Sequence, residues 1–220
     1  LHPPTLRFYT WNPVAISLGY HQRQWADHWQ HLQWNGQAID LVRRPTGGRA
    51  VLHQGDLTYA VITSGLQGNR VQVYQTICEF LIQGWRSLGL DLHYGQADRG
   101  YIHNPNCFGT STDADLILAE GSKLIGSAQL RRGTTVLQHG SMQLQPDAAL
   151  FHQVFGVKPT LPKVSLNFAG NNFAGESLIE LITAALTESA IQCFGIELKT
   201  QPLSEAEWEA VLAHIERSVD

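Results

Sequence analysis

The sequence is short of charge and has no long apolar run. Charged residues are 15% of the 220 residues, with a net charge of −4. No block of Lys and Arg exceeds two residues, so the basic footprint of a nucleic-acid-binding protein is missing. No apolar stretch approaches the roughly 18 residues of a membrane span, and no signal peptide opens the chain. We therefore expect neither nucleic acid nor a membrane as a partner.

Cysteine is also scarce. Cys78, Cys107 and Cys193 are the whole set, without a C-x-x-C pair, which argues against a disulfide framework and a metal site and favours a reducing cytoplasm. Cys78 and Cys193 fall on expected helices, and we predict both in the core. Cys107 lies in the polar stretch NPNCFGTSTDADL, so it is either a spare surface thiol or a nucleophile. The composition leaves both open.

The apolar pattern predicts an α+β fold. Strands are expected at 6–11, 15–20, 38–45, 49–53, 56–62, 91–95, 114–120, 122–132, 134–144 and 196–202, and helices at 23–34, 71–89, 147–155, 176–194 and 204–217. Turn signals at Asn12–Pro13 and Gln54–Gly55 suggest hairpins, and residues 158–172 look irregular. Strands that come in hairpins and meanders between helices indicate a mainly antiparallel mixed sheet with packed helices. We see one domain, 1–220.

The densest candidate site is RRPTGGRAVLHQGDLTY, residues 43–59. Arg43 and Arg44 end an expected strand, and the Gly47–Gly48 turn exposes backbone amides, with His53 shortly after. Such a turn can bring amides and positive charge to a phosphate or an acyl carbonyl. Neither a Walker loop nor a G-x-G-x-x-G fingerprint is present. A plain hairpin turn with solvated arginines explains these residues equally well.

A second candidate is GSKLIGSAQLRR, residues 121–132. Lys123 begins an expected strand, and the small residues Gly126–Ala128 lie inside it. A strand weakened in this way usually admits another backbone or a ligand. His139 follows in the next strand, beside a glycine. The alternative is a solvated lysine at a strand end.

Together these stretches resemble the biotin/lipoate protein ligase and acyltransferase family. RRPTGGRAVLH resembles its RRxxGG…H signature, and GSKLIGSAQLRR with LQHGS resembles its lysine segment. The order and spacing match from about residue 6 to the C-terminal helix. The nearest likeness is to the cysteine-dependent octanoyltransferases of the LipM type, which carry a CF loop upstream of the lysine segment. In the ligases a third glycine tends to follow the GG pair, whereas this chain has Arg49 there, which gives TGGR as in the transferases. Relatives begin with a helix before the first hairpin, for which we expect no counterpart here.

The resemblance implies roles for these residues. Cys107 would be the nucleophile. Lys123 would bind the acyl carbonyl, stabilise oxyanion charge and lower the Cys107 pKa. The substrate-binding residues would be Arg43, Arg44, Gly47, Gly48, Arg49, His53, Gly126, Ala128, Gln129 and His139. No metal is implied.

The resemblance also implies substrates and partners. An octanoyl or lipoyl group would pass from acyl carrier protein, through a Cys107 thioester, to a lysine of a lipoyl-domain protein such as the glycine-cleavage H protein, without a cofactor. Three alternatives stay open at this point. The chain could be an ATP-dependent lipoate–protein ligase, a lipoyl or octanoyl amidotransferase, or a non-catalytic domain that binds a carrier.

Overall fold

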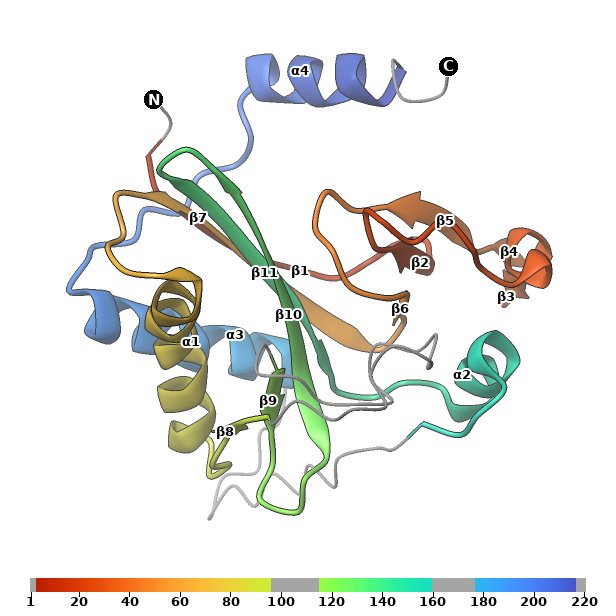
Figure 1. The fold of residues 1–220 in the computed structure, drawn as a ribbon, viewed down its shortest axis with the longest axis horizontal. Coiled ribbons are helices and arrows are strands. Elements are labelled where there is room, and N and C mark those ends of the chain that lie inside the picture. The colour runs from red at the N-terminus through yellow and green to blue at the C-terminus, as the bar shows by residue number, and fades with distance from the viewer. Residues whose placement is uncertain (1–2, 96–114, 160–176, 217–220) are drawn as a thin grey trace.

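A computed structural model describes residues 3–95, 115–159 and 177–216. One antiparallel sheet has six strands in the order β1-β7-β11-β10-β9-β8. They are β1 (Thr5–Tyr9), β7 (Asp56–Ser64), β8 (His93–Tyr94), β9 (Asp115–Ile117), β10 (Lys123–Arg132) and β11 (Thr135–Gln143). The expected meander β9–β10–β11 is confirmed, with Leu130 opposite Leu137. β10 and β11 form the long pair at the centre of Figure 1.

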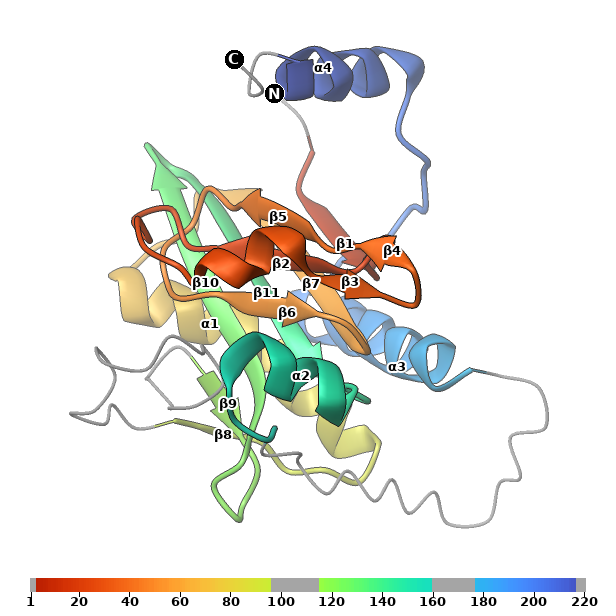
Figure 2. The same ribbon diagram turned by 90° about the vertical axis from the view of Figure 1, so that its right-hand side faces the viewer.

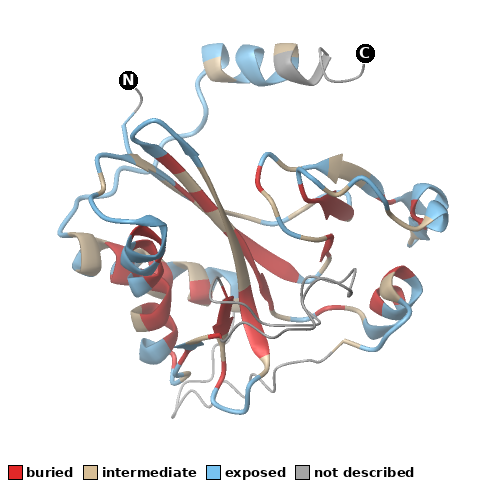
Figure 3. Ribbon diagram, in the orientation of Figure 1, coloured by how far each residue is buried: buried red, intermediate tan, exposed pale blue. Residues whose placement is uncertain are grey.

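Two helices cover one face of this sheet. α1 (Arg70–Ser87) and α3 (Leu178–Phe194) confirm the helices expected at 71–89 and 176–194. The apolar stripe of α1 is buried, with Leu81 and Trp85 each 0% exposed. Gly84 lets α3 approach closely, since a Cβ there would lie 2.7 Å from Leu186 Cδ2. Burial is concentrated along this helix–sheet contact in Figure 3.

A second layer lies on the other face of the six-stranded sheet (Figure 2). It is a mixed three-stranded sheet in which β2 (Ala15–Leu18) runs parallel to β5 (Asp40–Arg43) and antiparallel to β6 (Val51–His53). The helix α2 (Ala148–Phe155) packs against it, as predicted near 147–155. This layer has its own apolar core, which includes Trp29, Leu52 and Phe151.

The two hairpins expected around Asn12–Pro13 and Gln54–Gly55 are wrong. β1 pairs with β7, whereas β2 pairs with β5 and β6, and β6 and β7 lie in different sheets. For β6 and β7 the reason is that both edges of β7 are occupied. β7 pairs with β1 on one side and β11 on the other, which leaves no free edge for β6. At both turns the chain crosses from one layer to the other, so each turn carries residues toward the space between the sheets.

The helix expected at 23–34 is wrong as well. Only Asp27–His31 is helical, as the short 3-10 turn η1, and β3 (Gln33–Trp34) and β4 (Gln37–Ala38) form a hairpin after it. Asn35 and Gly36 at its tip have φ of 49° and 79°, the left-handed conformation that an Asn-Gly hairpin turn requires. The turn ends any helix before it can reach residue 34.

The C-terminal part also departs from expectation in one respect. Residues 196–202 form no strand and are exposed. α4 (Glu205–Glu216) follows, and Ser204 and Glu207 form the predicted capping box. Figures 1 and 2 both show α4 standing away from the two sheets. The irregular stretch expected at 158–172 falls mostly outside the described residues. Among the described helices, none has the length and apolar character needed to cross a membrane.

Candidate active site

A cavity of about 670 Å³ lies between the two sheets. One wall comes from β7, β10 and β11, and the opposite wall from β2, β5, β6 and the turn after β5. The predicted site residues that line it are Arg43, Arg44, Gly47, Gly48, His53, Lys123, Gly126, Ala128, Gln129 and His139. Arg49 is not among the lining residues. The two motifs, some 75 residues apart in the sequence, therefore face each other across one cavity.

Lys123 presents a buried cation to this cavity. It begins β10, and its Nζ lies 2.8 Å from Oδ1 of Asp115 on β9. The two side chains are 4% and 3% exposed, and a cation buried this deeply requires such a partner. The register that brings them together places Asp115 opposite Gly126, after a shift between Lys123 and Ile125. Sequence reasoning missed Asp115, because a single acidic residue at a strand start carries no pattern of its own.

The glycines of the lysine segment make room for this arrangement. A Cβ on Gly126 would lie 2.8 Å from Lys123 Cε and 3.1 Å from its Nζ. A Cβ on Gly140, in β11, would lie 2.6 Å from the Gly126 carbonyl oxygen. The distances of 2.8 and 2.6 Å are too short for a real Cβ atom. The missing side chains therefore make room for the lysine at Gly126 and for a neighbouring backbone at Gly140. The prediction that this strand is weakened for a close approach is explained by these contacts.

His139 joins the two walls of the cavity. It projects from β11, and its Nε2 lies 2.6 Å from Oγ1 of Thr46 in the turn after β5. Burial, together with smaller contributions from Arg44 and His53, lowers the pKa of His139 from 6.5 to about 4. The imidazole is therefore neutral at neutral pH and acts as a hydrogen-bonding bridge rather than as a charge.

The two arginines of the first motif bind the protein's own backbone. Arg43 Nη1 donates to the carbonyls of Gly19 and Gln22 at 2.8 and 2.7 Å. Arg44 donates to the carbonyls of Ser17, Gly47 and Arg49 at 2.8, 2.9 and 2.7 Å. Both side chains line the cavity, yet Arg43 uses donors to hold the segment after β2, and Arg44 uses donors to hold the turn after β5. Gly48, with φ of 97°, fits against Arg44, since a Cβ there would lie 2.7 Å from Nη2.

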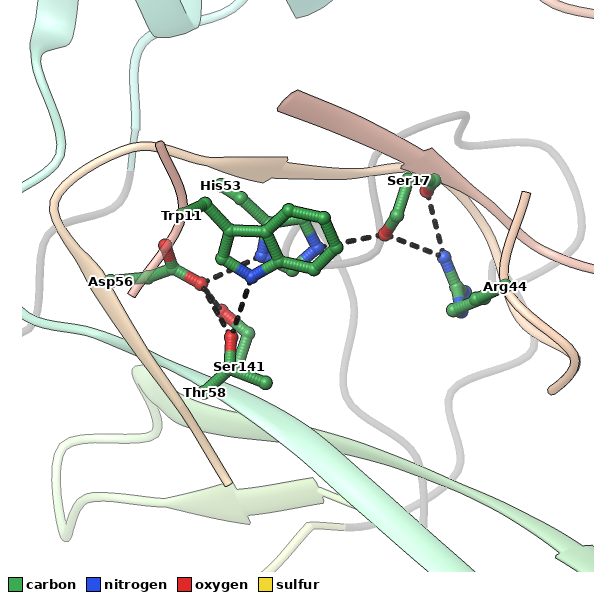
Figure 4. A network of polar contacts seen from close by, with 7 residues as sticks. All are labelled: Trp11, Ser17, Arg44, His53, Asp56, Thr58 and Ser141. Atoms are coloured by element: carbon green, nitrogen blue, oxygen red, sulfur yellow. Dashed lines mark hydrogen bonds and ion pairs between the residues drawn. The ribbon is translucent and has the colours of Figure 1, made fainter. Parts of the chain in front are cut away.

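A polar network connects this wall to β7 and β11 (Figure 4). His53 Nδ1 lies 2.8 Å from Asp56 Oδ2, and His53 Nε2 lies 2.8 Å from Ser17 Oγ. The Trp11 ring stacks on the His53 ring at 4.1 Å between centroids. Ser17 and Asp56, at 2% and 4% exposed, were not predicted as site residues. The order H-x-x-D in residues 53–56 was the available signal for the His–Asp contact.

Cys78 is a core thiol, as predicted. It is 0% exposed and accepts a hydrogen bond from Gln138 Nε2 at 3.3 Å. Burial raises its pKa to about 12, so it carries no thiolate at neutral pH. Cys193 is half-buried and packs against the same core. Gln129 is linked to this thiol through Gln138, since Gln129 Nε2 donates to Gln138 Oε1 at 2.8 Å.

The predicted nucleophile, Cys107, lies outside the described residues, as does the whole CF loop. Within the described ranges, no group of three or more His, Cys, Asp or Glu side chains is placed to hold a metal ion. The part of the site that can be built from the structure is thus the cavity, the Lys123–Asp115 pair and the wall opposite it.

Comparison with known proteins gives the family. The sequence model of the lipoyl protein ligase A/B catalytic domain matches residues 1–167. The chain belongs to this family. The octanoyltransferase LipM of Lysinibacillus sphaericus is 33% identical over 237 residues, which cover 97% of this chain and 83% of the relative. The octanoyltransferase LipM of Kyrpidia tusciae is 42% identical over 161 residues, covering 68% of this chain and 58% of the relative.

Solved structures of lipoate ligases share the fold. Protein Ta0514, a putative lipoate protein ligase from T. acidophilum with bound lipoic acid, has a TM-score of 0.78 at 24% identity, covering 98% of this chain and 83% of that one. A lipoate-protein ligase A bound with ATP has a TM-score of 0.71 at 26% identity, covering 94% and 79%. The expected α+β ligase-like fold is confirmed. Alignment with several LipM relatives spans only 58–59% of their length.

Within the lipoyl ligase A/B fold, the cavity is suited to an acyl carbonyl. Val42, Val51 and Leu137 give it apolar wall area, while Lys123 places a positive charge among them. A preorganised cation in a water-poor site stabilises negative charge as it develops on a carbonyl oxygen. The same charge also suits a carboxylate or an acyl-adenylate, so the cavity by itself does not choose between transfer and ligation.

Proposed function

We propose that this chain is an octanoyltransferase of protein lipoylation. The observation that carries the proposal is the buried Lys123–Asp115 pair, 2.8 Å apart, on a cavity with apolar walls. Support comes from the LipM octanoyltransferases that it resembles at 33–42% identity. An octanoyl chain fits apolar walls, and its thioester carbonyl fits a fixed cation.

The proposed reaction has two steps, both through Cys107. The Cys107 thiolate attacks the thioester carbonyl of the donor, and the donor's thiolate leaves and takes up a proton, which gives an octanoyl-enzyme thioester. The amine of an acceptor lysine then attacks this thioester, forms an amide, loses a proton and releases the Cys107 thiol. Covalent catalysis divides the transfer, so the two carriers bind in turn.

Lys123 acts in both steps by the same electrostatic effect. Each attack places negative charge on the carbonyl oxygen, and the ammonium group stabilises that charge. In the proposed reaction the same cation would also favour the thiolate form of Cys107, since a positive charge beside a thiol lowers its pKa. The Gly126–Gln129 segment of β10, whose backbone follows the lysine, supplies amide donors near the same position.

The proposed donor is octanoyl-acyl carrier protein, and the proposed acceptor is a lipoyl-domain protein such as the glycine-cleavage H protein. The first thioester is exchanged for another, and aminolysis of a thioester is downhill. The proposed reaction therefore uses no ATP and no cofactor. An archaeal bi-partite lipoate protein ligase of the same fold was analysed together with its E2 lipoyl domain. This likeness supports a lipoyl domain as the acceptor class.

A second candidate is an ATP-dependent lipoate ligase, which the likeness to lipoate-protein ligase A with bound ATP favours. Lys123 would then contact an acyl-adenylate, and Cys107 would have no part in the reaction. The two functions require different donors, and this difference makes them separable in one assay.

The test offers each donor to the purified chain with a lipoyl domain and follows acceptor mass. We expect octanoyl-carrier protein to modify the acceptor without ATP, and Cys107→Ser to reduce the rate roughly 10³-fold or more, as loss of a nucleophile does. Modification from octanoate plus ATP, unchanged by Cys107→Ser, would establish the ligase instead. Lys158, an exposed lysine, provides a control substitution, Lys158→Ala, that should change neither rate.

A further inference from the structure

The polar network that joins the two walls of the cavity has no part in the transfer steps above. It runs from Asp56 through His53 and Ser17 to Arg44, with 2.8, 2.8 and 3.2 Å between successive polar atoms. These residues come from β7, β6, β2 and the end of β5, so the network crosses from the six-stranded sheet to the three-stranded one (Figure 4).

The chemistry of the groups fixes the direction of each hydrogen bond. The Asp56 carboxylate only accepts, and its Oδ2 already accepts from Ser141 at 2.6 Å and from Thr58 at 3.3 Å. In a neutral His53 the proton therefore lies on Nδ1, and Nε2 is an acceptor. Ser17 then donates to Nε2, and its oxygen is free to accept from Arg44. The hydrogen bonds from Asp56 Oδ2 to Arg44 therefore fit one consistent arrangement of donors and acceptors.

Beyond Arg44 the network continues into the cavity wall. Arg44 Nη2 donates to the carbonyls of Gly47 and Arg49, on both sides of Gly48. Thr46, in the same turn, contacts His139 on β11 at 2.6 Å. The series of contacts begins on β11, where Ser141 bonds Asp56, and ends on β11, where His139 contacts Thr46. His139 and Ser141 are two residues apart on this strand. The contacts form a ring, and several of its members line the cavity.

The order Ser17–His53–Asp56 is that of a hydrolase triad, but two observations oppose a nucleophilic serine. Ser17 lies inside β2, which pairs with β5 and β6 on its two sides, and it is 2% exposed. In addition, a triad histidine becomes a cation during reaction, and the Arg44 guanidinium bonded to the same serine disfavours a second positive charge there. The geometry is that of a fixed support rather than of an attacking group.

We propose that Asp56, His53 and Ser17 are positioning residues that hold Arg44, and through it the turn 46–49, at a set distance from β10 and β11. This distance fixes the width of the cavity and hence which acyl chains it accepts. The proposal rests on the proposed function only in taking an acyl chain as the ligand. Breaking the ring should loosen selectivity for chain length while leaving the Lys123–Asp115 pair in place.

The test is equilibrium binding, which does not depend on transfer through Cys107. Ser17→Ala removes one donor and one acceptor at almost constant volume. We expect it to weaken binding of octanoate about tenfold, the size of one or two lost hydrogen bonds, and to reduce the preference for octanoate over dodecanoate. Ser189→Ala, at a buried serine away from the cavity, is the matched control and should match the unsubstituted chain.

Steady-state transfer gives a second readout. KM for the octanoyl donor should rise with kcat nearly unchanged, whereas a fall in kcat at constant KM would overturn the positioning role. Labelling of Ser17 by a fluorophosphonate would also overturn it, as would octanoate and dodecanoate affinities equal to those of the unsubstituted chain. If circular dichroism shows that Ser17→Ala is unfolded, Ser141→Ala breaks the ring at its other end and must give the same loss of selectivity.

Discussion

The two walls of the cavity use charge in opposite ways. On the β10 wall, Lys123 is paired with the Asp115 carboxylate, and the absence of a side chain at Gly126 makes room for the end of the lysine side chain. On the opposite wall, the guanidinium groups of Arg43 and Arg44 bind main-chain carbonyls of that same wall. Both motifs look like anion-binding segments in the sequence. The difference indicates that one wall supplies the chemistry and the other supplies the shape.

The strongest way to break this comparison is to remove the charge of the β10 wall. Lys123→Ala should lower kcat/KM for octanoyl transfer by about 10²- to 10³-fold, as loss of a preorganised oxyanion-stabilising group does. Because the substitution leaves the buried Asp115 carboxylate without its cation, the variant should be less stable. The rate is therefore divided by the folded fraction, which circular dichroism measures. A variant that keeps its full rate per folded molecule would show that the lysine is not in the reaction.

The space beside Lys123 can be tested separately from its charge. In Gly126→Ala the new Cβ meets the lysine side chain, and the resulting displacement should lower kcat by up to about 10²-fold. Gly47→Ala is the counterpart on the other wall, where a Cβ meets nothing within 4 Å, and its effect should be much smaller. Equal losses in the two variants would contradict the division between the walls.

His139, which bridges the walls, should make stability depend on pH. Its pKa is about 4 in the folded chain against an ordinary 6.5, so the unfolded chain takes up the proton first as pH falls. Stability should therefore drop by on the order of 2 to 3 kcal/mol between pH 6.5 and 4 on account of this residue. Urea unfolding of His139→Gln at several pH values should show a flatter profile, and the exposed His152→Gln should leave it unchanged.

The smallest effect is expected away from both walls. Ser204→Ala removes the capping hydroxyl of α4 and should lower helix stability by about 0.5 to 1 kcal/mol, with kcat and KM of transfer unchanged. Far-ultraviolet circular dichroism and the transfer assay measure the two effects. A change in kcat would show that α4 takes part in the site, which the two-wall description excludes.

Local pattern predicted much of this molecule. The apolar pattern of residues 71–89 predicts α1, and the successive strand-like runs at 114–120, 122–132 and 134–144 predict the β9–β10–β11 meander. Family motifs, rather than pattern, placed Lys123 and the TGG turn at one site. Their shared cavity confirms that these segments come together.

What the sequence could not provide was strand partnership between distant segments. Neighbouring strands such as β6 and β7 looked like a hairpin, but β7 is paired with β1 and β11 on its two sides, and this competition for an edge cannot be seen in the local sequence. For the same reason, the sequence did not predict Asp115 and Ser17 as site residues. Each is an isolated polar residue in or beside an apolar strand, and only the register of β9 against β10, or of β2 against β6, gives it a partner.

The most direct test of the proposed reaction is intact-protein mass after incubation with octanoyl-acyl carrier protein and no acceptor. The account predicts a gain of one octanoyl group, absent in Cys107→Ser, and its loss when a lipoyl domain is added. An acceptor that becomes octanoylated while the chain never gains mass, or a gain that persists in Cys107→Ser, would contradict it.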